Sequence, residues 1–267
     1  MQQDSAQTWP RCSVRRASET SLYASDSTDM NWHTAAESHP GMRRKINEDI
    51  VLTRPDDGLW VVADGMGGHE AGDVASRMVS ESLAALHCPD GLAAFVDGVE
   101  DTLLGINTLI REHSATHFGG RTMGCTVVSL LVRGRAGIAL WAGDSRLYRL
   151  REAEFLQITR DHSPLEELIE QGVMTDEEAA KHPDNNVITR AVGGQSELRL
   201  DIVMFDIQPG DVFLLCSDGL YRELSFDEIK AHLLHSDLAV SVAAMLKQAL
   251  ERGARDNVSI VLTRCAA

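Results

Sequence analysis

The chain has 267 residues, of which 43% are hydrophobic and 24% charged, and its formal net charge is −15 with a pI near 5.0. This composition is typical of a globular protein with a large core and excludes disorder over most of the length. The acidity argues against nucleic acid or an anionic membrane surface as a partner, because phosphate groups are bound chiefly through clustered Lys and Arg. The excess acids form either an ordinary solvated surface or, where several converge, a site for cations.

The five cysteines are widely spaced and form no CxxC pair, so the sequence predicts neither a disulfide framework nor a zinc site. Cys125 and Cys216 stand in apolar runs, where a free thiol behaves as a small buried hydrophobe. No apolar run approaches the ~18 residues that span a bilayer, and the N-terminus lacks a signal-peptide core. We therefore expect a soluble, cytoplasmic protein.

Residues 1–30 are rich in Ser, Thr, Gln and Asp and show no periodicity, which predicts a flexible tail before a single domain over 31–267. Short β-branched and aliphatic runs predict strands. In chain order these are Leu59–Ala63, Met123–Val132, Gly137–Ala142, Arg146–Leu150, Asp201–Phe205, Val212–Cys216 and Val258–Leu262. Apolar residues at three- and four-residue spacing predict helices. These are Asp73–His87, Leu92–His113, Ser225–Leu234 and Leu238–Arg252.

The order of these elements is not a regular alternation of strand and helix. Two helices follow Asp64, several strands come next as hairpins, and two helices return near the end of the chain. This order favours an α/β protein of the α+β kind, with antiparallel sheets covered by helices, over a doubly wound parallel sheet.

Residues 162–186 form a polar insert between predicted strands. Ser163, Pro164 and Glu166 supply a helix cap, a first-turn proline and a capping-box glutamate, and Thr175 and Glu178 repeat the box. Two short helices are therefore predicted. Such an insert is either a surface excursion or a lid over a site.

Three predicted strands end in the same way, with a carboxylate at the C-terminal edge. Their sequences are Leu-Trp-Val-Val-Ala-Asp64, Ile-Ala-Leu-Trp-Ala-Gly-Asp144 and Val-Phe-Leu-Leu-Cys-Ser-Asp218. Asp256 stands just before the last strand, so an antiparallel arrangement would bring it to the same edge. Taken singly, the Asp-Gly pairs at 64–65 and 218–219 are equally compatible with hairpin turns. The repetition, together with Arg44, Glu48 and Asp49 in one short segment, favours a shared site.

Carboxylates that converge repel one another and either take up protons or bind a hard cation. Ligand sets made of oxygen alone select magnesium, manganese or calcium over zinc. Two ions about 3.5–4 Å apart can activate a shared water and hold both oxygens of a phosphoryl transfer. Arg44 would supply a bidentate guanidinium for the phosphate.

The sequence resembles the type 2C, or PPM-type, metal-dependent protein serine/threonine phosphatases in their compact bacterial form. Six motifs occur in that family's order between about Trp32 and Arg264. They are Arg44-x-x-Asn47-Glu48-Asp49, Val62-Ala-Asp64-Gly-Met-Gly-Gly-His69, Gly124-Cys-Thr126, Gly143-Asp-Ser-Arg146, Ser217-Asp-Gly-Leu220 and Asp256-Asn257. Any one of these motifs would be weak, but six in the right order are specific.

The resemblance implies a four-layer α-β-β-α sandwich with two central, mainly antiparallel sheets and a metal centre at one edge. It also implies two Mn²⁺ or Mg²⁺ ions and the option of a third, with residues 162–186 as a variable flap. By position, one ion would be held by Glu48, Asp64 and the Gly65 carbonyl, and the other by Asp64, Asp218 and Asp256. The third would be held by Asp144 and Asp218.

The resemblance also assigns roles to residues beside the metals. Asp49 would orient the metal-activated water, and Thr126 would be either a supporting or a packing residue. Many eukaryotic relatives carry a proposed general-acid histidine directly after the Asp-Gly pair, and here that position is Met66. Proton donation must then come from water or another group; His69 is a candidate, and His162 a weaker one.

The predicted function is hydrolysis of phosphoserine and phosphothreonine in proteins, which would reverse a serine/threonine kinase in signalling. The implied partners are phosphorylated proteins, including such a kinase and its targets, and we expect a monomer. The alternative is a catalytically silent phosphatase-like module that binds or scaffolds a phosphorylated partner. Such modules typically lose metal ligands, and every expected ligand is present here.

Overall fold

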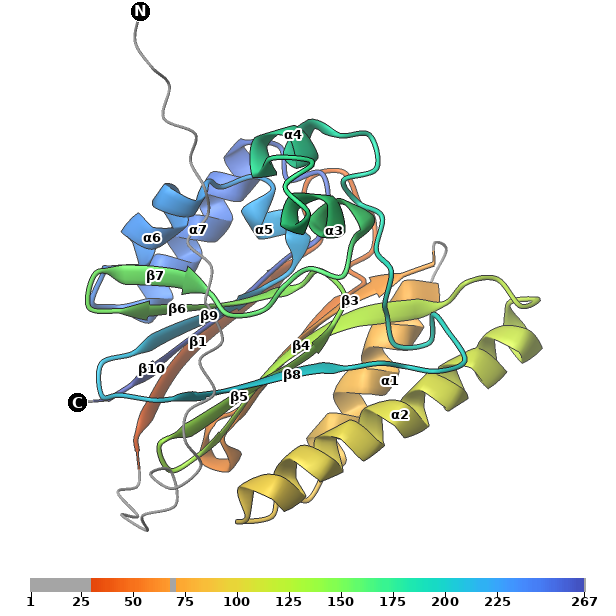
Figure 1. Ribbon diagram of the computed structural model, residues 1–267, viewed down its shortest axis with the longest axis horizontal. Helices are drawn as coiled ribbons and strands as arrows, with labels where there is room; N and C mark the ends of the chain where they lie inside the picture. Colours follow the sequence, from red (N-terminus) through yellow and green to blue (C-terminus); the bar gives the residue numbers. More distant parts are fainter. Residues whose placement is uncertain (1–29, 68–70, 267) are drawn as a thin grey trace, which may run out of the picture.

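The computed structural model describes residues 30–67 and 71–266, in which two five-stranded sheets lie face to face (Figure 1). Every strand pair in both sheets is antiparallel. The first sheet has the order β2-β3-β4-β5-β8, with bounds Asp49–Arg54, Leu59–Met66, Gly124–Arg133, Ala136–Ala142 and Asp201–Asp206. The second has the order β1-β10-β9-β6-β7, with bounds Trp32–His39, Val258–Cys265, Val212–Cys216, Arg146–Arg151 and Glu154–Gln157.

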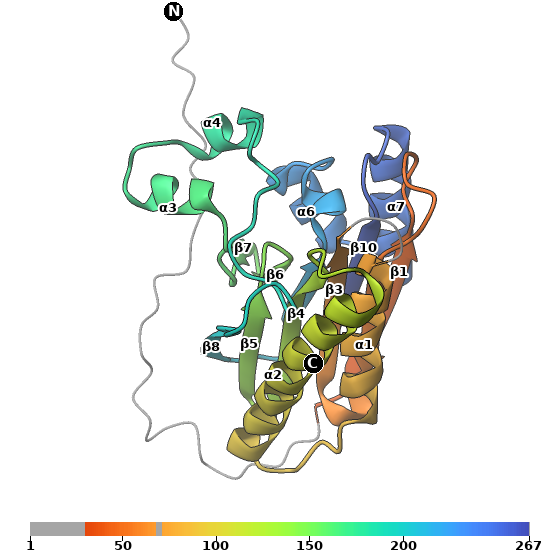
Figure 2. The ribbon, with the colours of Figure 1, turned by 90° about the vertical axis from the view of Figure 1, so that its right-hand side faces the viewer.

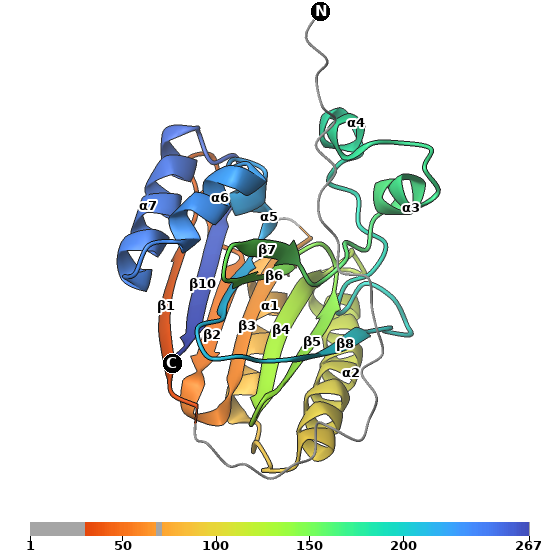
Figure 3. The ribbon, with the colours of Figure 1, turned by 60° about the vertical axis from the view of Figure 1, so that its left-hand side comes forward.

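Helices cover the outer faces of both sheets and make the outer two layers (Figures 1 and 3). The first sheet carries α1 (Ala71–Ala85) and α2 (Leu92–His117), and the second carries α5 (Asp218–Tyr221), α6 (Phe226–Leu233) and α7 (Leu238–Glu251). The α-β-β-α prediction for the fold is therefore confirmed. No helix within residues 30–67 and 71–266 is long and apolar enough to cross a membrane.

The central strands are apolar along their whole length because both of their faces are buried. In β3, Val61 packs toward α1 and α2, whereas Trp60 and Val62 pack between the two sheets. In β9, Leu214 faces the α6 and α7 side, whereas Phe213 and Leu215 face the other sheet. Because successive side chains of a strand point to opposite faces, each central strand contributes residues to two hydrophobic layers. The predicted burial of Cys125 and Cys216 is also confirmed, because both thiols are fully buried.

The insert forms the two predicted helices, α3 (Pro164–Glu170) and α4 (Asp176–Lys181). The Ser163 hydroxyl accepts a hydrogen bond from the Glu166 N–H, and Thr175 with Glu178 makes a complete capping box. These caps satisfy N–H groups that short helices otherwise leave without partners. Figures 2 and 3 show both helices standing away from the sheets, and Figure 3 shows them at the same end of the molecule as α5.

Three edge strands were not predicted by the sequence analysis: β1, β2 and β7. β1 has the sequence WHTAAESH and is only half-buried at the edge of its sheet, so it lacks an apolar signature. β7 has four residues and forms the opposite edge. β2 begins at Asp49, a residue that the sequence analysis considered only as an acid of the site. Edge strands bury less apolar surface than central ones, which weakens their sequence pattern.

Candidate metal centre

The register of the strands brings the predicted acids to one end of the two sheets. In the first sheet Asp49 on β2 lies opposite Asp64 on β3, which in turn lies opposite Thr126 on β4. In the second sheet Cys216, the last residue of β9, lies opposite Ile260 near the start of β10. The segments just beyond this point therefore meet, and they carry the remaining acids of the cluster, Asp218 at the start of α5, Asp256 before β10 and Asp144 before β6.

Asp49 joins the two sheets through a buried hydrogen bond. Its Oδ2 accepts from the hydroxyl of Ser217, 2.7 Å away, and that hydroxyl in turn accepts from the Ser259 N–H at 3.0 Å. Asp49 is only 4% exposed, so its orientation is fixed by Ser217. The chain positions Asp49 beside Asp64 without allowing it to reach solvent.

Asn257 fixes the loop that carries Arg44 and Glu48. Its side-chain oxygen accepts from the Glu48 N–H at 2.8 Å, and its amide nitrogen donates to the carbonyls of Pro40 and Ile46, both at 3.0 Å. Three hydrogen bonds from one side chain hold this loop against the start of β10. Arg44 extends from the loop, and its Nη2 donates to Oδ2 of Asp256 at 2.7 Å.

Asp144 lies in a tight turn that Thr126 supports. Gly143 has φ +113°, and a Cβ at this position would lie 2.5 Å from the Thr126 Cβ, so the turn requires glycine. The Thr126 hydroxyl is also hydrogen-bonded to the hydroxyl of Ser145, the residue after Asp144, at 2.7 Å. The Tyr221 hydroxyl donates to the Asp144 carbonyl at 3.1 Å and to its Oδ2 at 3.3 Å.

Gly65 is enclosed by backbone. A Cβ there would lie 2.3 Å from the Gly72 carbonyl oxygen and 2.7 Å from that of Glu48. The Gly65 N–H also donates to the Glu48 carbonyl at 3.1 Å. Because these neighbours are backbone atoms that cannot rotate away, no larger residue fits, and the Gly65 backbone approaches the acid cluster closely.

Burial and mutual repulsion raise the pKa of four acids in this cluster, Asp49, Asp64, Asp144 and Asp218. Burial is the largest cause at Asp64, whose pKa lies well above its usual range, and the charges of Asp49 and Asp218 raise it further. Burial raises the pKa of Asp49 to about 6 and, with the Asp218 charge, that of Asp144 to about 7. Burial raises the pKa of Asp218 to about 6, against the opposing charge of Arg222. Such a cluster favours protons or a cation.

The donor set fits hard divalent ions. All of the predicted side-chain ligands are carboxylates, the set that magnesium and manganese prefer. Among the described residues, Oε1 of Glu48 and Oδ1 of Asp49 are buried acceptors that receive no hydrogen bond. In the same part of the chain, no three acids are already arranged at metal-ligand spacing. Asp256 instead turns toward Arg44 and Asp218 toward Arg222.

The Asp-Gly pairs at 64–65 and 218–219 are not hairpin turns, so that alternative is wrong. Gly65 lies inside β3 and Gly219 inside α5, and neither has a positive φ. A third Asp-Gly pair shows the contrast, because Gly58 after Asp57 adopts a left-handed conformation with φ +59° in the turn between β2 and β3.

The structure describes only one of the two predicted proton donors, His162. His69 lies outside the described residues, and the structure does not test its role. His162 is buried behind Asp144: its Nδ1 accepts from the Gly143 N–H at 3.1 Å, and its ring stacks on Trp141. Its Nε2 lies 3.2 Å from Oδ2 of Asp201. These contacts give His162 a structural place between the flap and the Gly143 turn.

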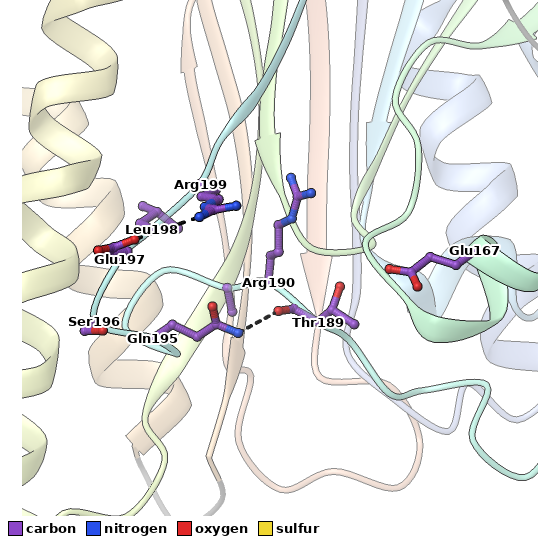
Figure 4. Close-up of a pocket in the computed structure, with 9 residues that line it drawn as sticks. Glu167, Thr189, Arg190, Gln195, Ser196, Glu197, Leu198 and Arg199 are labelled. Atoms are coloured by element: carbon purple, nitrogen blue, oxygen red, sulfur yellow. Dashed lines mark hydrogen bonds and ion pairs between the residues drawn. The ribbon is translucent and has the colours of Figure 1, made fainter.

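A groove of about 1220 Å³ extends from the flap to Asp256, which is the one acid of the cluster in its lining. Its lining includes Asp256 and Arg222 from the cluster side and Glu166 and Asp176 from the flap helices. A smaller pocket of about 350 Å³, drawn in Figure 4, lies between Glu167 of α3 and residues 189–199. None of the predicted site acids lines the smaller pocket, so the groove is the candidate substrate site.

Sequence reasoning missed four residues that shape the site. Asn257 and Ser217 were quoted only as motif neighbours, and Tyr221 and Arg222 were not considered. Arg222 donates to Oδ2 of Asp218 at 2.9 Å, a contact one helical turn away. That spacing of four residues was the only sequence signal available for it.

Comparison with known proteins shows the family of the chain. The family model described as Protein phosphatase 2C matches residues 42–262. The serine/threonine protein phosphatase PstP of Mycobacterium tuberculosis is 35% identical over 228 residues, which is 85% of this chain and 44% of PstP. This chain thus spans less than half of that relative's length. The protein phosphatase PhpP of Streptococcus pneumoniae is 34% identical over 237 residues, which is 83% of this chain and 93% of PhpP.

Solved structures show the same fold. PppA, described as a key regulatory component of T6SS in Pseudomonas aeruginosa, is 41% identical with a TM-score of 0.82, covering 88% of this chain and 97% of PppA. The PstP catalytic domain, solved with 2 manganese ions, is 34% identical with a TM-score of 0.80, covering 89% of this chain and 100% of that one. The chain therefore belongs to the protein phosphatase 2C family.

Proposed function

We propose that this chain hydrolyses phosphoserine and phosphothreonine in proteins with the help of two divalent metal ions. The observation that carries the proposal is the convergence of Glu48, Asp64, Asp218 and Asp256 at one end of the two sheets. Family membership at 34–35% identity to named protein phosphatases supports the same activity. The two manganese ions in the PstP catalytic domain support Mn²⁺ as the cofactor, with Mg²⁺ as a substitute.

The ligand sets follow the sequence motifs. Glu48, Asp64 and the Gly65 carbonyl would hold one ion, and Asp64, Asp218 and Asp256 the other. The close packing around Gly65 and the unpartnered Oε1 of Glu48 support the first set. When bound, two such ions activate a water and stabilise the developing charge of the phosphoryl group.

Two further side chains, Asp49 and Arg44, would orient the attacking water and bind the substrate phosphate. Asp49, held by Ser217, has a buried Oδ1 without a hydrogen bond, and we propose that it orients the attacking water. The Arg44 side chain is 52% exposed and has Asp256 as its ion-pair partner, so it can turn to a substrate phosphate. A planar guanidinium would bind two phosphate oxygens at once.

The groove supports a protein as the substrate. At about 1220 Å³ it exceeds the 300–1,000 Å³ of pockets that enclose small ligands. We propose that the groove accepts an extended phosphorylated segment, with residues 162–186 as the flap of one catalytic domain over 31–267. A serine/threonine kinase and its targets are the proposed partners in cytoplasmic signalling, and the catalytic unit is proposed to be a monomer. The scaffold alternative is not favoured, because every ligand position keeps its carboxylate.

A phosphate-release assay tests this function. Phosphothreonine and phosphoserine peptides are expected to lose phosphate in millimolar Mn²⁺, to stay intact in chelator, and to lose phosphate again when Mn²⁺ is restored. A phosphotyrosine peptide serves as the control for residue specificity. Binding of the phosphopeptides in Mn²⁺ without any release of phosphate would instead identify the chain as a scaffold.

A further inference from the structure

Arg222 lies between the two acids that were predicted to hold a third metal ion. It follows α5, one helical turn after Asp218, and its Nε donates to Oδ2 of Asp218 at 2.9 Å. Its Nη2 lies 3.6 Å from Oδ2 of Asp144. The side chains of Asp144 and Asp218 are only 10% and 15% exposed, so the guanidinium places a positive charge beside both acids in a site largely closed to solvent.

A third contact holds the guanidinium from the flap. Nη2 of Arg222 also donates to the Asn185 carbonyl at 2.9 Å, in the segment that follows α4. The Arg222 side chain is 26% exposed, compared with 52% for Arg44, whose contact with the cluster is the single ion pair with Asp256. Arg222 is therefore fixed by the fold at three points, whereas Arg44 is free to exchange partners.

The neighbouring residue completes the environment of Asp144. The Tyr221 hydroxyl donates to Asp144, and the Tyr221 ring is covered by the guanidinium of Arg146 at 3.6 Å. Arg146 is itself bound by both oxygens of Asp161 at the base of the flap. Asp144 thus receives a hydroxyl donor and a nearby guanidinium. A divalent ion would have to displace Arg222 to use both acids as ligands.

We propose that Arg222 takes the place of a third divalent ion in this chain. Its guanidinium provides a positive charge between Asp144 and Asp218 and connects both acids to the flap through the Asn185 carbonyl. A planar group with several donors suits two carboxylates and a carbonyl at once. The proposal rests on the two-metal function above and limits this chain to two ions.

Counting bound Mn²⁺ tests the proposal independently of activity. Equilibrium dialysis from micromolar to millimolar Mn²⁺, with elemental analysis of the protein, is expected to give two ions per chain for the wild type. Arg222→Met is expected to bind three, and the double variant Arg222→Met/Asp144→Asn is expected to return to two. Arg255→Met is the matched control: Arg255 lines the same groove but pairs with Glu223 at 3.3 Å, and two ions are expected.

The outcomes separate this proposal from the function on which it rests. A wild type that binds three ions, or a folded Arg222→Met that binds two, would overturn the role of Arg222 alone. A wild type that binds no Mn²⁺ would overturn the two-metal centre itself. Circular dichroism and thermal unfolding identify any variant that does not fold. Arg222→Gln is neutral but keeps a polar group toward Asn185. It replaces the Met variant if that variant fails to fold, and it is also expected to bind three ions.

Discussion

Asp64→Asn is expected to reduce Mn²⁺-dependent phosphate release from a phosphothreonine peptide by about a thousandfold or more. Changing a residue that only orients a metal ligand typically costs about 10–100-fold, and a shared ligand costs more. Asp64 lies directly opposite Asp49 in the first sheet. Burial and the charges of Asp49, Asp218, Asp144 and Asp256 raise its pKa. The substitution keeps the shape of the side chain and removes the charge that both proposed ions share.

Asp57→Asn provides the matched control for this experiment. Asp57 also precedes a glycine and lies at the opposite end of β3, and it pairs with the half-buried Arg54. A surface ion pair contributes about 0–1 kcal/mol, so activity should be unchanged. Full activity in a folded Asp64→Asn protein would remove Asp64 from the metal centre, whereas equal losses in both variants would point to general destabilisation.

Mn²⁺ is expected to raise the melting temperature by about 5–10 °C at an ion concentration near 100 times Kd. Preferential binding to the folded state at that concentration contributes about 2.7 kcal/mol, and each kcal/mol shifts the melting temperature of a chain this long by about 2–4 °C. Differential scanning calorimetry measures the shift. Sodium chloride of the same ionic strength is the control for screening, and a melting curve unaffected by Mn²⁺ would count against the acid cluster as a metal site.

The size of this shift should depend on pH. The folded-state pKa values of Asp49 and Asp218, about 6, and of Asp144, about 7, lie above those of unfolded carboxyls. An acid whose pKa is raised by folding favours the folded state at low pH and loses that contribution as pH rises through the folded pKa. The metal-free protein should therefore lose stability from about pH 4 to pH 7. Mn²⁺ competes with these protons, so its stabilisation should be larger at about pH 8 than at about pH 5.5.

Most of the fold could be predicted because its central strands are buried on both faces. Val212–Cys216 was predicted with the bounds that the structure has, and the caps at Ser163 and Thr175 placed both flap helices correctly. The edge strand β1 could not be predicted in the same way, because its pairing with β10 holds it in place more than its own apolar residues do. Tertiary pairing of this kind leaves no periodic pattern in the sequence.

The candidate site also has a part that the sequence predicts and a part that depends on tertiary packing. Its acids could be predicted because each stands at a strand end within a specific motif, but their supporting contacts could not. The bond between Ser217 and Asp49 joins residues 168 positions apart, and the bond between Asn257 and Glu48 joins residues 209 apart. The position of the Arg222 side chain beside Asp144 and Asp218 depends on the direction in which α5 leaves β9. Such contacts follow from the packing of the two sheets, which one sequence does not reveal.

The position of bound manganese decides whether the acid cluster is a two-metal centre. Crystals grown with Mn²⁺ and measured at a wavelength where manganese scatters anomalously would locate each ion without assumptions about activity. We expect two anomalous peaks about 3.5–4 Å apart, both in contact with Asp64, one beside Glu48 and the other beside Asp218 and Asp256. Peaks that do not share Asp64, or manganese bound only outside this cluster, would contradict this expectation.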